Sequence, residues 1–167
     1  MSDAFETRDA FIARFGGVFE HSPWIAEAAW DAGLPPDANT AEGLHAALVT
    51  QFRAASRDKR LGVLLAHPDL AGRLAIRGEL TADSTAEQAS AGLDKCTPQE
   101  YARFQELNDT YKARFGFPFI LAVRGLTRAA ILENFAARVG NDAETEFATA
   151  TVQVERIALL RLKEMLP

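Results

Sequence analysis

The chain has 167 residues, of which 48% are hydrophobic and 25% are charged, and its formal net charge is −5. These proportions are typical of a globular protein and exclude a disordered chain or a coiled coil. Basic residues are scattered among acidic ones and no apolar run is long enough to cross a bilayer, so neither a nucleic-acid partner nor a membrane partner is expected.

Helices are predicted along most of the chain, because Ser or Thr N-caps recur at their starts and glycines at their ends. The clearest start is Thr97-Pro98-Gln99-Glu100, which combines an N-cap, a first-turn proline and a capping glutamate. The helix that follows is expected to run through Tyr111 and to end at Gly116. In chain order the predicted helices cover residues 7–15, 22–33, 40–55, 57–66, 84–94, 97–111, 127–139 and 142–166.

Three stretches interrupt this pattern. Residues 34–39 and 67–81 contain prolines and glycines and are predicted to be irregular. Residues 117–123 resemble a single strand, but a lone strand has no partner with which to form a sheet. The predicted fold class is therefore all-α, a single compact domain over residues 1–167 with about eight or nine helices.

The only cysteine, Cys96, cannot form an internal disulfide or a cysteine-based zinc site. Its simplest interpretation is a small residue near a helix end. The first six residues lack the positive region and apolar run of a signal peptide. Both observations predict a cytoplasmic location.

His67 is the first candidate for chemistry, because Pro68 disfavours the α conformation at the residue before it. The helix 57–66 is thus expected to stop at His67. At a helix C-terminus the dipole favours imidazolium, which could deliver a proton near neutral pH. A histidine that merely caps the helix explains the same pattern.

Ser84 and Glu87 have the spacing of a capping box, in which Glu87 would bond to the Ser84 backbone and do no chemistry. A helix start that carries a hydroxyl, a carboxylate and the amide of Gln88 is also a good polar binding corner. The sequence alone leaves both interpretations open.

Arg161 lies on the apolar stripe of the last predicted helix, among Val154, Ile157 and Ala158. A buried guanidinium needs an anionic or hydrogen-bonding partner, which could be a carboxylate of the protein or a group of a ligand. The apolar, non-helical run 117–123 poses a similar choice, because its backbone groups either pack in a buried loop or line a pocket.

Taken together and in order, several short motifs resemble the OHCU decarboxylases, which act on 2-oxo-4-hydroxy-4-carboxy-5-ureidoimidazoline (OHCU) in urate breakdown. The resemblance covers nearly the whole chain. Its marks are Glu20-His21-Ser22-Pro23-Trp24, His67-Pro68-Asp69-Leu70, Ser84-Thr85-Ala86-Glu87-Gln88 with Ala91-Gly92-Leu93, Asn108-Asp109-Thr110-Tyr111, and Phe115-Gly116-Phe117-Pro118-Phe119.

This resemblance implies a homodimeric, all-helical enzyme that converts OHCU to S-allantoin and carbon dioxide without a cofactor or metal. It also implies that His67 and Glu87 are the catalytic pair. The residues that it implies for the substrate site are Pro68, Ser84, Thr85, Ala86, Gln88, Phe119, Ile120, Leu121, Ala122, Val123 and Arg161.

Two other functions compete with this one. The three histidines, His21, His45 and His67, could in principle meet to hold zinc in a metal-dependent hydrolase of a ureido compound, although none shows the i, i+4 pairing of a helical zinc motif. A non-catalytic helical binding module would explain the caps and apolar faces, but it explains Arg161 poorly.

Overall fold

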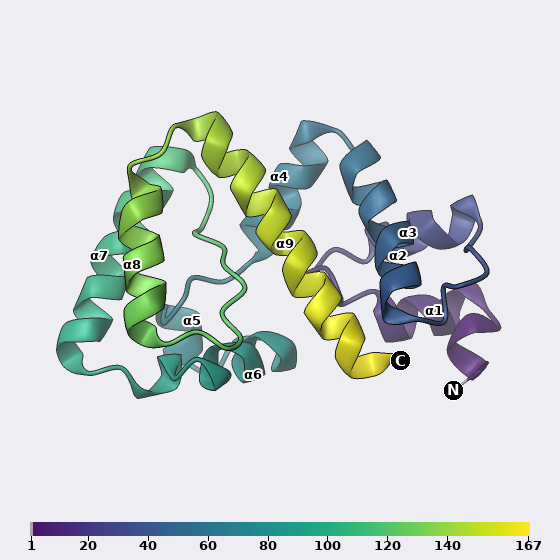
Figure 1. The fold of residues 1–167 in the computed structure, drawn as a ribbon, viewed down its shortest axis with the longest axis horizontal. Helices are drawn as coiled ribbons and strands as arrows, with labels where there is room; N and C mark the ends of the chain where they lie inside the picture. Colours follow the sequence, from purple (N-terminus) through teal and green to yellow (C-terminus); the bar gives the residue numbers. More distant parts are fainter. Residues whose placement is uncertain (1) are drawn as a thin grey trace. The chain divides into compact units, whose positions relative to one another are not determined.

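The structure, a computed structural model, describes the backbone of residues 2–167 and all of their side chains except those of residues 2, 3 and 74. Within this range every regular element is a helix and no strand is present, so the all-α prediction is confirmed (Figure 1). The α-helices are α1 (Arg8–Phe15), α2 (Trp24–Ala32), α3 (Ala41–Ala54), α4 (Arg57–Ala66), α5 (Arg73–Ile76), α6 (Ala82–Ser90), α7 (Pro98–Phe115), α8 (Arg128–Val139) and α9 (Ala143–Met165). Two 3-10 helices, η1 (Ser2–Phe5) and η2 (Leu93–Lys95), complete the set.

The internal contacts of the chain divide it into two compact units. The first unit holds the chain up to Ala66 together with Val154–Pro167, and the second unit holds His67–Gln153. The division falls inside α9, so this helix contributes residues to both units.

In the first unit, α2 packs against both α1 and α3. The core is aromatic where Phe11 lies 5.1 Å from Phe15 and 5.3 Å from Trp30, measured between ring centroids. Phe11 and Phe52 are fully buried. Burial of such large side chains contributes about 1.5–3 kcal/mol each to the hydrophobic free energy.

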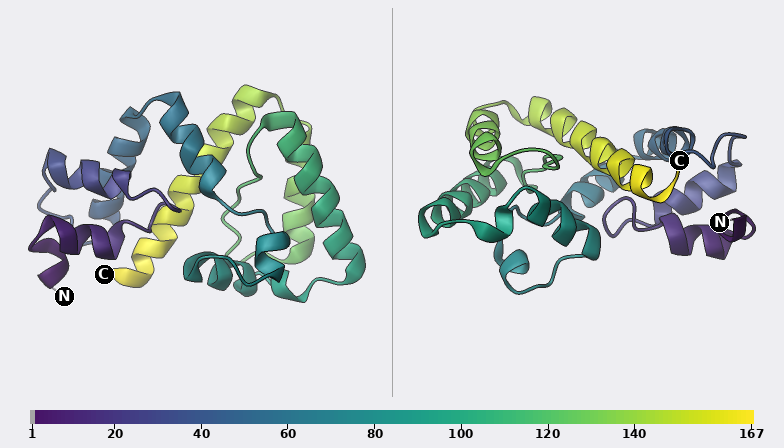
Figure 2. Two further views of the ribbon diagram at one scale, coloured as in Figure 1. Left: turned by 180° about the vertical axis from the view of Figure 1, so that it is seen from behind. Right: turned by 60° about the horizontal axis from the view of Figure 1, so that its bottom comes forward.

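In the second unit, α7 and α8 run side by side (Figures 1 and 2). Helix α7 has the predicted capping box between Thr97 and Glu100, and Gly116 ends it with a φ of 79°, a conformation that glycine adopts without steric cost. Tyr111 of α7 lies among aromatic rings from the same unit, namely Phe115, Phe117, Phe119 and Phe135.

Three local predictions need correction. Helix α6 begins at Ala82 with Thr81 as its N-cap, three residues before the predicted cap Ser84. Helix α2 begins after Pro23, because the Ser22 hydroxyl donates to the Glu20 carbonyl instead of capping the helix. The irregular stretch 67–81 contains the one-turn helix α5.

Among residues 2–167, no helix combines the length and the apolar character needed to span a bilayer.

Candidate active site

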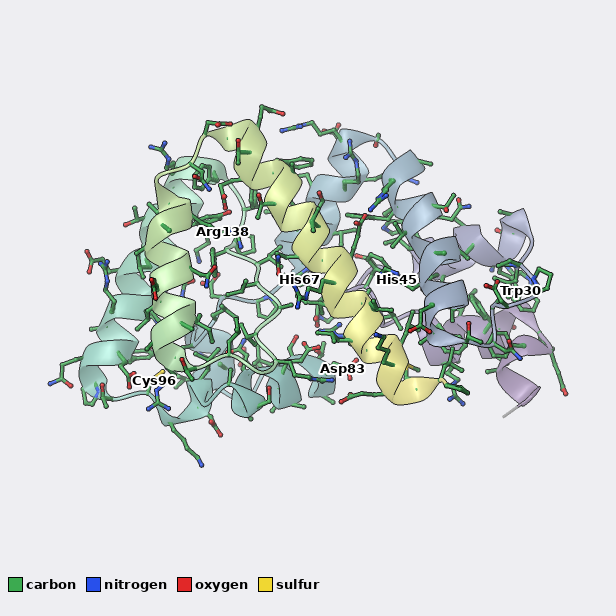
Figure 3. All side chains as sticks on the ribbon, in the orientation of Figure 1. Trp30, His45, His67, Asp83, Cys96 and Arg138 are labelled. Atoms are coloured by element: carbon green, nitrogen blue, oxygen red, sulfur yellow. The ribbon has the colours of Figure 1, made fainter. Side chains whose placement is uncertain are left out.

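His67 follows directly after α4, as the proline at position 68 predicts (Figure 3). Its side chain is buried, with 8% of its surface exposed, and Pro68 is half-buried. His67 is the first residue of the second unit, which also holds α6 and the segment 119–123. Most of the predicted site residues therefore belong to one compact unit.

Ser84, Glu87 and Gln88 share one face of α6, since residues three and four apart are neighbours on a helix. Ser84 and Gln88 are buried and Glu87 is half-buried. Because the Thr81 hydroxyl caps α6 by accepting from the Ser84 backbone N–H at 3.2 Å, the predicted Ser84–Glu87 capping box is wrong. Glu87 therefore does not act as the capping glutamate of α6.

Thr85 and Ala86 lie on the exposed side of α6. The Thr85 hydroxyl donates to the Thr81 carbonyl at 2.9 Å, as side chains in a helix often do. A pocket of ≈ 450 Å³ in the second unit includes Thr85 and Gln88 among its lining residues, but neither His67 nor Glu87. The pocket therefore does not contain the predicted catalytic pair.

Gln88 joins α6 to the turn that follows His67. Its amide oxygen accepts from the Ala71 N–H at 3.0 Å, and its amide nitrogen donates to the Asp69 carbonyl at 3.1 Å. These two bonds bring the buried face of α6 against the chain two residues after His67. The predicted residues of α6 and the predicted histidine thus lie on neighbouring segments.

The segment 119–123 has no regular secondary structure and is almost entirely buried, with only Leu121 half-buried. Arg138 of α8 donates to the Ile120 carbonyl at 2.7 Å, and the Ala122 N–H donates to the Gln153 side chain at 3.0 Å. Phe119 stacks on Phe135 with ring centroids 3.9 Å apart. Side chains outside the segment therefore satisfy two of its backbone polar groups, the Ile120 carbonyl and the Ala122 N–H.

Arg138 also connects this segment to a buried cluster around Glu146, which is completely inaccessible to solvent. Its carboxylate accepts from the Tyr111 hydroxyl at 2.5 Å, from Arg138 Nε at 2.9 Å and from the Asn141 side chain at 2.9 Å. Burial and the hydrogen bond to Glu146 raise the pKa of Tyr111, so its phenol stays protonated. The cluster thus contains a buried ion pair, Arg138–Glu146, whose carboxylate also accepts from Tyr111 and Asn141.

Arg161 belongs to the first unit, where its side chain is 3% exposed. Its Nη2 donates to Glu20 at 2.8 Å, and its Nη1 donates to the Gly17 and Val18 carbonyls at 3.3 and 3.4 Å. Of the two partners that the sequence allowed, the protein carboxylate is present. A role for Arg161 in binding substrate stays a prediction.

The metal-dependent alternative gains no support from residues 2–167, where no group of three or more His, Cys, Asp or Glu side chains is arranged to hold a metal ion. His45 makes a 2.8 Å hydrogen bond through Nε2 to the Glu155 carbonyl, as expected for a residue on a helix face. Cys96 lies just before the α7 N-cap, and burial raises the pKa of its thiol.

Sequence reasoning missed the side chains that support the site, namely Gln105, Lys112, Arg138, Glu146 and Gln153. Arg138 was the most accessible to prediction, because it lies in a helix that also buries Ile131 and Phe135. The same argument that singled out Arg161 applies to it. The other four occupy positions at which a polar residue is unremarkable.

Comparison with known proteins assigns the chain to a family. The family model described as OHCU decarboxylase matches residues 6–163. The chain is 44% identical over 156 residues to the 2-oxo-4-hydroxy-4-carboxy-5-ureidoimidazoline decarboxylase of Haloferax volcanii, which covers 93% of this chain and 89% of that protein. It is 40% identical over 158 residues to the decarboxylase of the same name from Halalkalicoccus jeotgali, covering 95% of this chain and 86% of that one.

Among solved structures, the crystal structure of (S)-allantoin synthase matches with a TM-score of 0.74 at 32% identity, covering 98% of this chain and 52% of that chain. The matched residues extend from just before α1 to the last turns of α9. The chain belongs to the OHCU decarboxylase family.

Proposed function

We propose that His67 and Glu87 manage the proton transfers by which this chain decarboxylates OHCU to S-allantoin and carbon dioxide, the last step of urate conversion to allantoin. Pro68, Gln88, the start of α6 and the segment 119–123 surround the substrate in this proposal. The observation that carries it is the pair of Gln88 hydrogen bonds, which join the face of α6 that bears Glu87 to the turn next to His67.

The chemistry of OHCU explains why neither a metal nor an organic cofactor enters the proposal. The carbon that loses its carboxylate is adjacent to a ring C=N bond, which accepts the electron pair of the breaking C–C bond. Carbon dioxide leaves, a C=C bond forms in the ring, and the ring nitrogen takes up a proton. The enol-like intermediate then loses its hydroxyl proton and gains a proton on the ureido-bearing carbon.

His67 delivers that last proton to one face of the carbon, and delivery from one side yields a single enantiomer. Glu87 orients the imidazole and stabilises its charged form. His67 is itself buried, which shields its imidazole from bulk water. Orientation of an already activated substrate supplies the remaining acceleration.

The test compares H67N with H21N, both assayed on freshly generated OHCU by the circular dichroism of the allantoin formed. His21 is a matched control, because its side chain is 67% exposed and its φ of 48° lies in the left-handed region that asparagine tolerates. We expect H67N to lose about 10²- to 10⁴-fold in kcat, the usual range for a general acid or base, while H21N keeps wild-type activity. A folded H67N variant with full activity and full enantiomeric excess would overturn the assignment.

The proposal extends to the state of the protein in the cell, a homodimer in the cytoplasm. The family resemblance supports the dimer, and a single, partly buried free thiol fits a reducing compartment. Light scattering of the purified protein tests the first point: a mass of one chain at micromolar concentration contradicts it. Fractionation of the source cells tests the second.

A further inference from the structure

We infer that the side-chain amides of Gln88, Gln105 and Asn108, here named the carboxamide clamp, position His67 by fixing the three residues of turn 69–71. This inference rests on the role proposed above for His67. Gln105 and Asn108 are positioning residues in this scheme, since they act through the backbone and not on the substrate.

The clamp bonds every residue of the turn. The Gln88 amide nitrogen donates to the Asp69 carbonyl at 3.1 Å, and the Gln88 amide oxygen accepts from the Ala71 N–H at 3.0 Å. Asn108 donates to the Leu70 carbonyl at 3.0 Å, and Gln105 donates to the Ala71 carbonyl at 2.7 Å. Four main-chain groups in three consecutive residues are therefore held by amides from two helices, α6 and α7.

An ion pair reinforces the turn at its first residue. Lys112 of α7 donates to the Asp69 carboxylate at 2.6 Å. Residues 105, 108 and 112 recur at the three- and four-residue spacing that places them on one face of α7. One face of this helix is thus devoted to holding the turn after His67.

The backbone of the turn needs such restraint. Ala71 has a φ of 49°, in the left-handed region that a residue with a Cβ rarely adopts. Such a conformation is strained and persists only where surrounding contacts enforce it. Here the clamp bonds both the N–H and the carbonyl of Ala71.

Asn108 supplies a second, independent observation. It is 1% exposed, and its Oδ1 has no hydrogen-bond partner although it is buried. A buried oxygen without a partner destabilises the folded state, so an amide at this position has a cost that some other contact must offset. The gain that offsets this cost is the bond from Nδ2 to the Leu70 carbonyl.

The clamp reaches His67 through one residue, Pro68, whose ring fixes its own φ. On the other side, His67 continues directly from the last residue of α4. The clamp therefore restrains the backbone of His67 from its C-terminal side. A loosened turn would let the imidazole drift, and a misplacement of about 1 Å can reduce a rate by roughly 10²-fold.

The test centres on Gln105, because Gln88 lies in the proposed substrate site. Q105M keeps the length of the side chain and removes its donor, whereas Q105K restores a donor to the Ala71 carbonyl. The matched control is Q99M, the same change at an exposed position of the same helix. If Q105M does not fold, N108L serves in its place, since it removes the donor together with the unsatisfied oxygen.

Two readouts are needed, steady-state kinetics and the imidazole ¹H–¹⁵N spectrum. The spectrum is simple, because the chain contains only three histidines. We expect Q105M to lose roughly tenfold or more in kcat with KM almost unchanged, and Q105K to recover most of it. In the spectrum of Q105M the His67 signals should shift, while those of His45, bonded to the Glu155 carbonyl in the other unit, should not.

The outcomes separate this inference from the proposal beneath it. An active wild type with wild-type kcat in Q105M overturns the clamp. A loss of kcat that Q105K does not restore, with unmoved His67 signals, also overturns it, because it indicates only a general loss of stability. A wild type that leaves the decay of OHCU unchanged overturns the proposed function, and the His67 signals then decide by themselves whether the clamp sets the ring position.

Discussion

Replacing Glu146 with glutamine is the most demanding test of the buried cluster in the second unit. The carboxylate is fully buried and accepts three hydrogen bonds, one of them from the guanidinium of Arg138. Glutamine keeps the shape but leaves Arg138 as a buried cation without an anion. Removing one partner of a buried ion pair costs about 3–5 kcal/mol, a large part of the ~5–15 kcal/mol that stabilises a typical domain.

Urea unfolding followed by circular dichroism measures this loss, with E144Q as the matched control. Glu144 lies two residues earlier in α9 and is exposed, so its replacement should change the free energy of unfolding by less than about 0.5 kcal/mol. The double variant E146Q/R138M should recover part of the loss, because it removes the unpaired charge as well. A loss below about 1 kcal/mol for E146Q, with an unchanged denaturant slope, would refute the reasoning.

Three further predictions concern single groups. Because burial raises the pKa of Tyr111, its phenol should not ionise in the folded protein near pH 10. The stability that the neutral phenol contributes should be complete below about pH 10 and should decline as the pH rises further. Absorbance at 295 nm measures the ionisation, and ionisation of both tyrosines before unfolding would contradict this prediction. The raised pKa of Cys96 predicts alkylation by iodoacetamide at pH 8 that is slower in the folded than in the urea-unfolded chain, and equal rates would disprove it. T97A should lower the free energy of unfolding by about 0.5–2 kcal/mol, since it removes the side-chain half of the capping box with Glu100; an unchanged urea midpoint would count against that cap.

Helix boundaries could be predicted from the sequence wherever a cap is the only candidate nearby. The cap at Thr97 and the glycine at position 116 delimit α7 as expected. At α6 the spacing of Ser84 and Glu87 predicts a capping box, but the helix begins three residues earlier with Thr81 as its N-cap. The structure uses Thr81, because starting there turns Ser84 and Gln88 toward the interior. Which face of a helix is buried depends on tertiary contacts that a local pattern does not contain.

The candidate site was predicted only in part for the same reason. Pro68 marked His67 as a residue at a helix end, and the family resemblance identified Glu87 as its partner. The side chains that hold the site come from far along the chain: Gln105 bonds a residue 34 positions away and Asn108 one 38 positions away. Glutamine and asparagine on a helix are ordinary surface residues by their type, so nothing in the sequence marked them as buried donors.

The discontinuity of the first unit has a consequence for synthesis on the ribosome. Its last segment, Val154–Pro167, is made after the whole of the second unit, yet Arg161 must pair with Glu20 across 141 positions of sequence. Until that segment leaves the exit tunnel, Glu20 lacks its guanidinium and the unit lacks one of its helices. The first unit therefore cannot close before its last segment has been made, whereas every residue of the second unit has been synthesised by then.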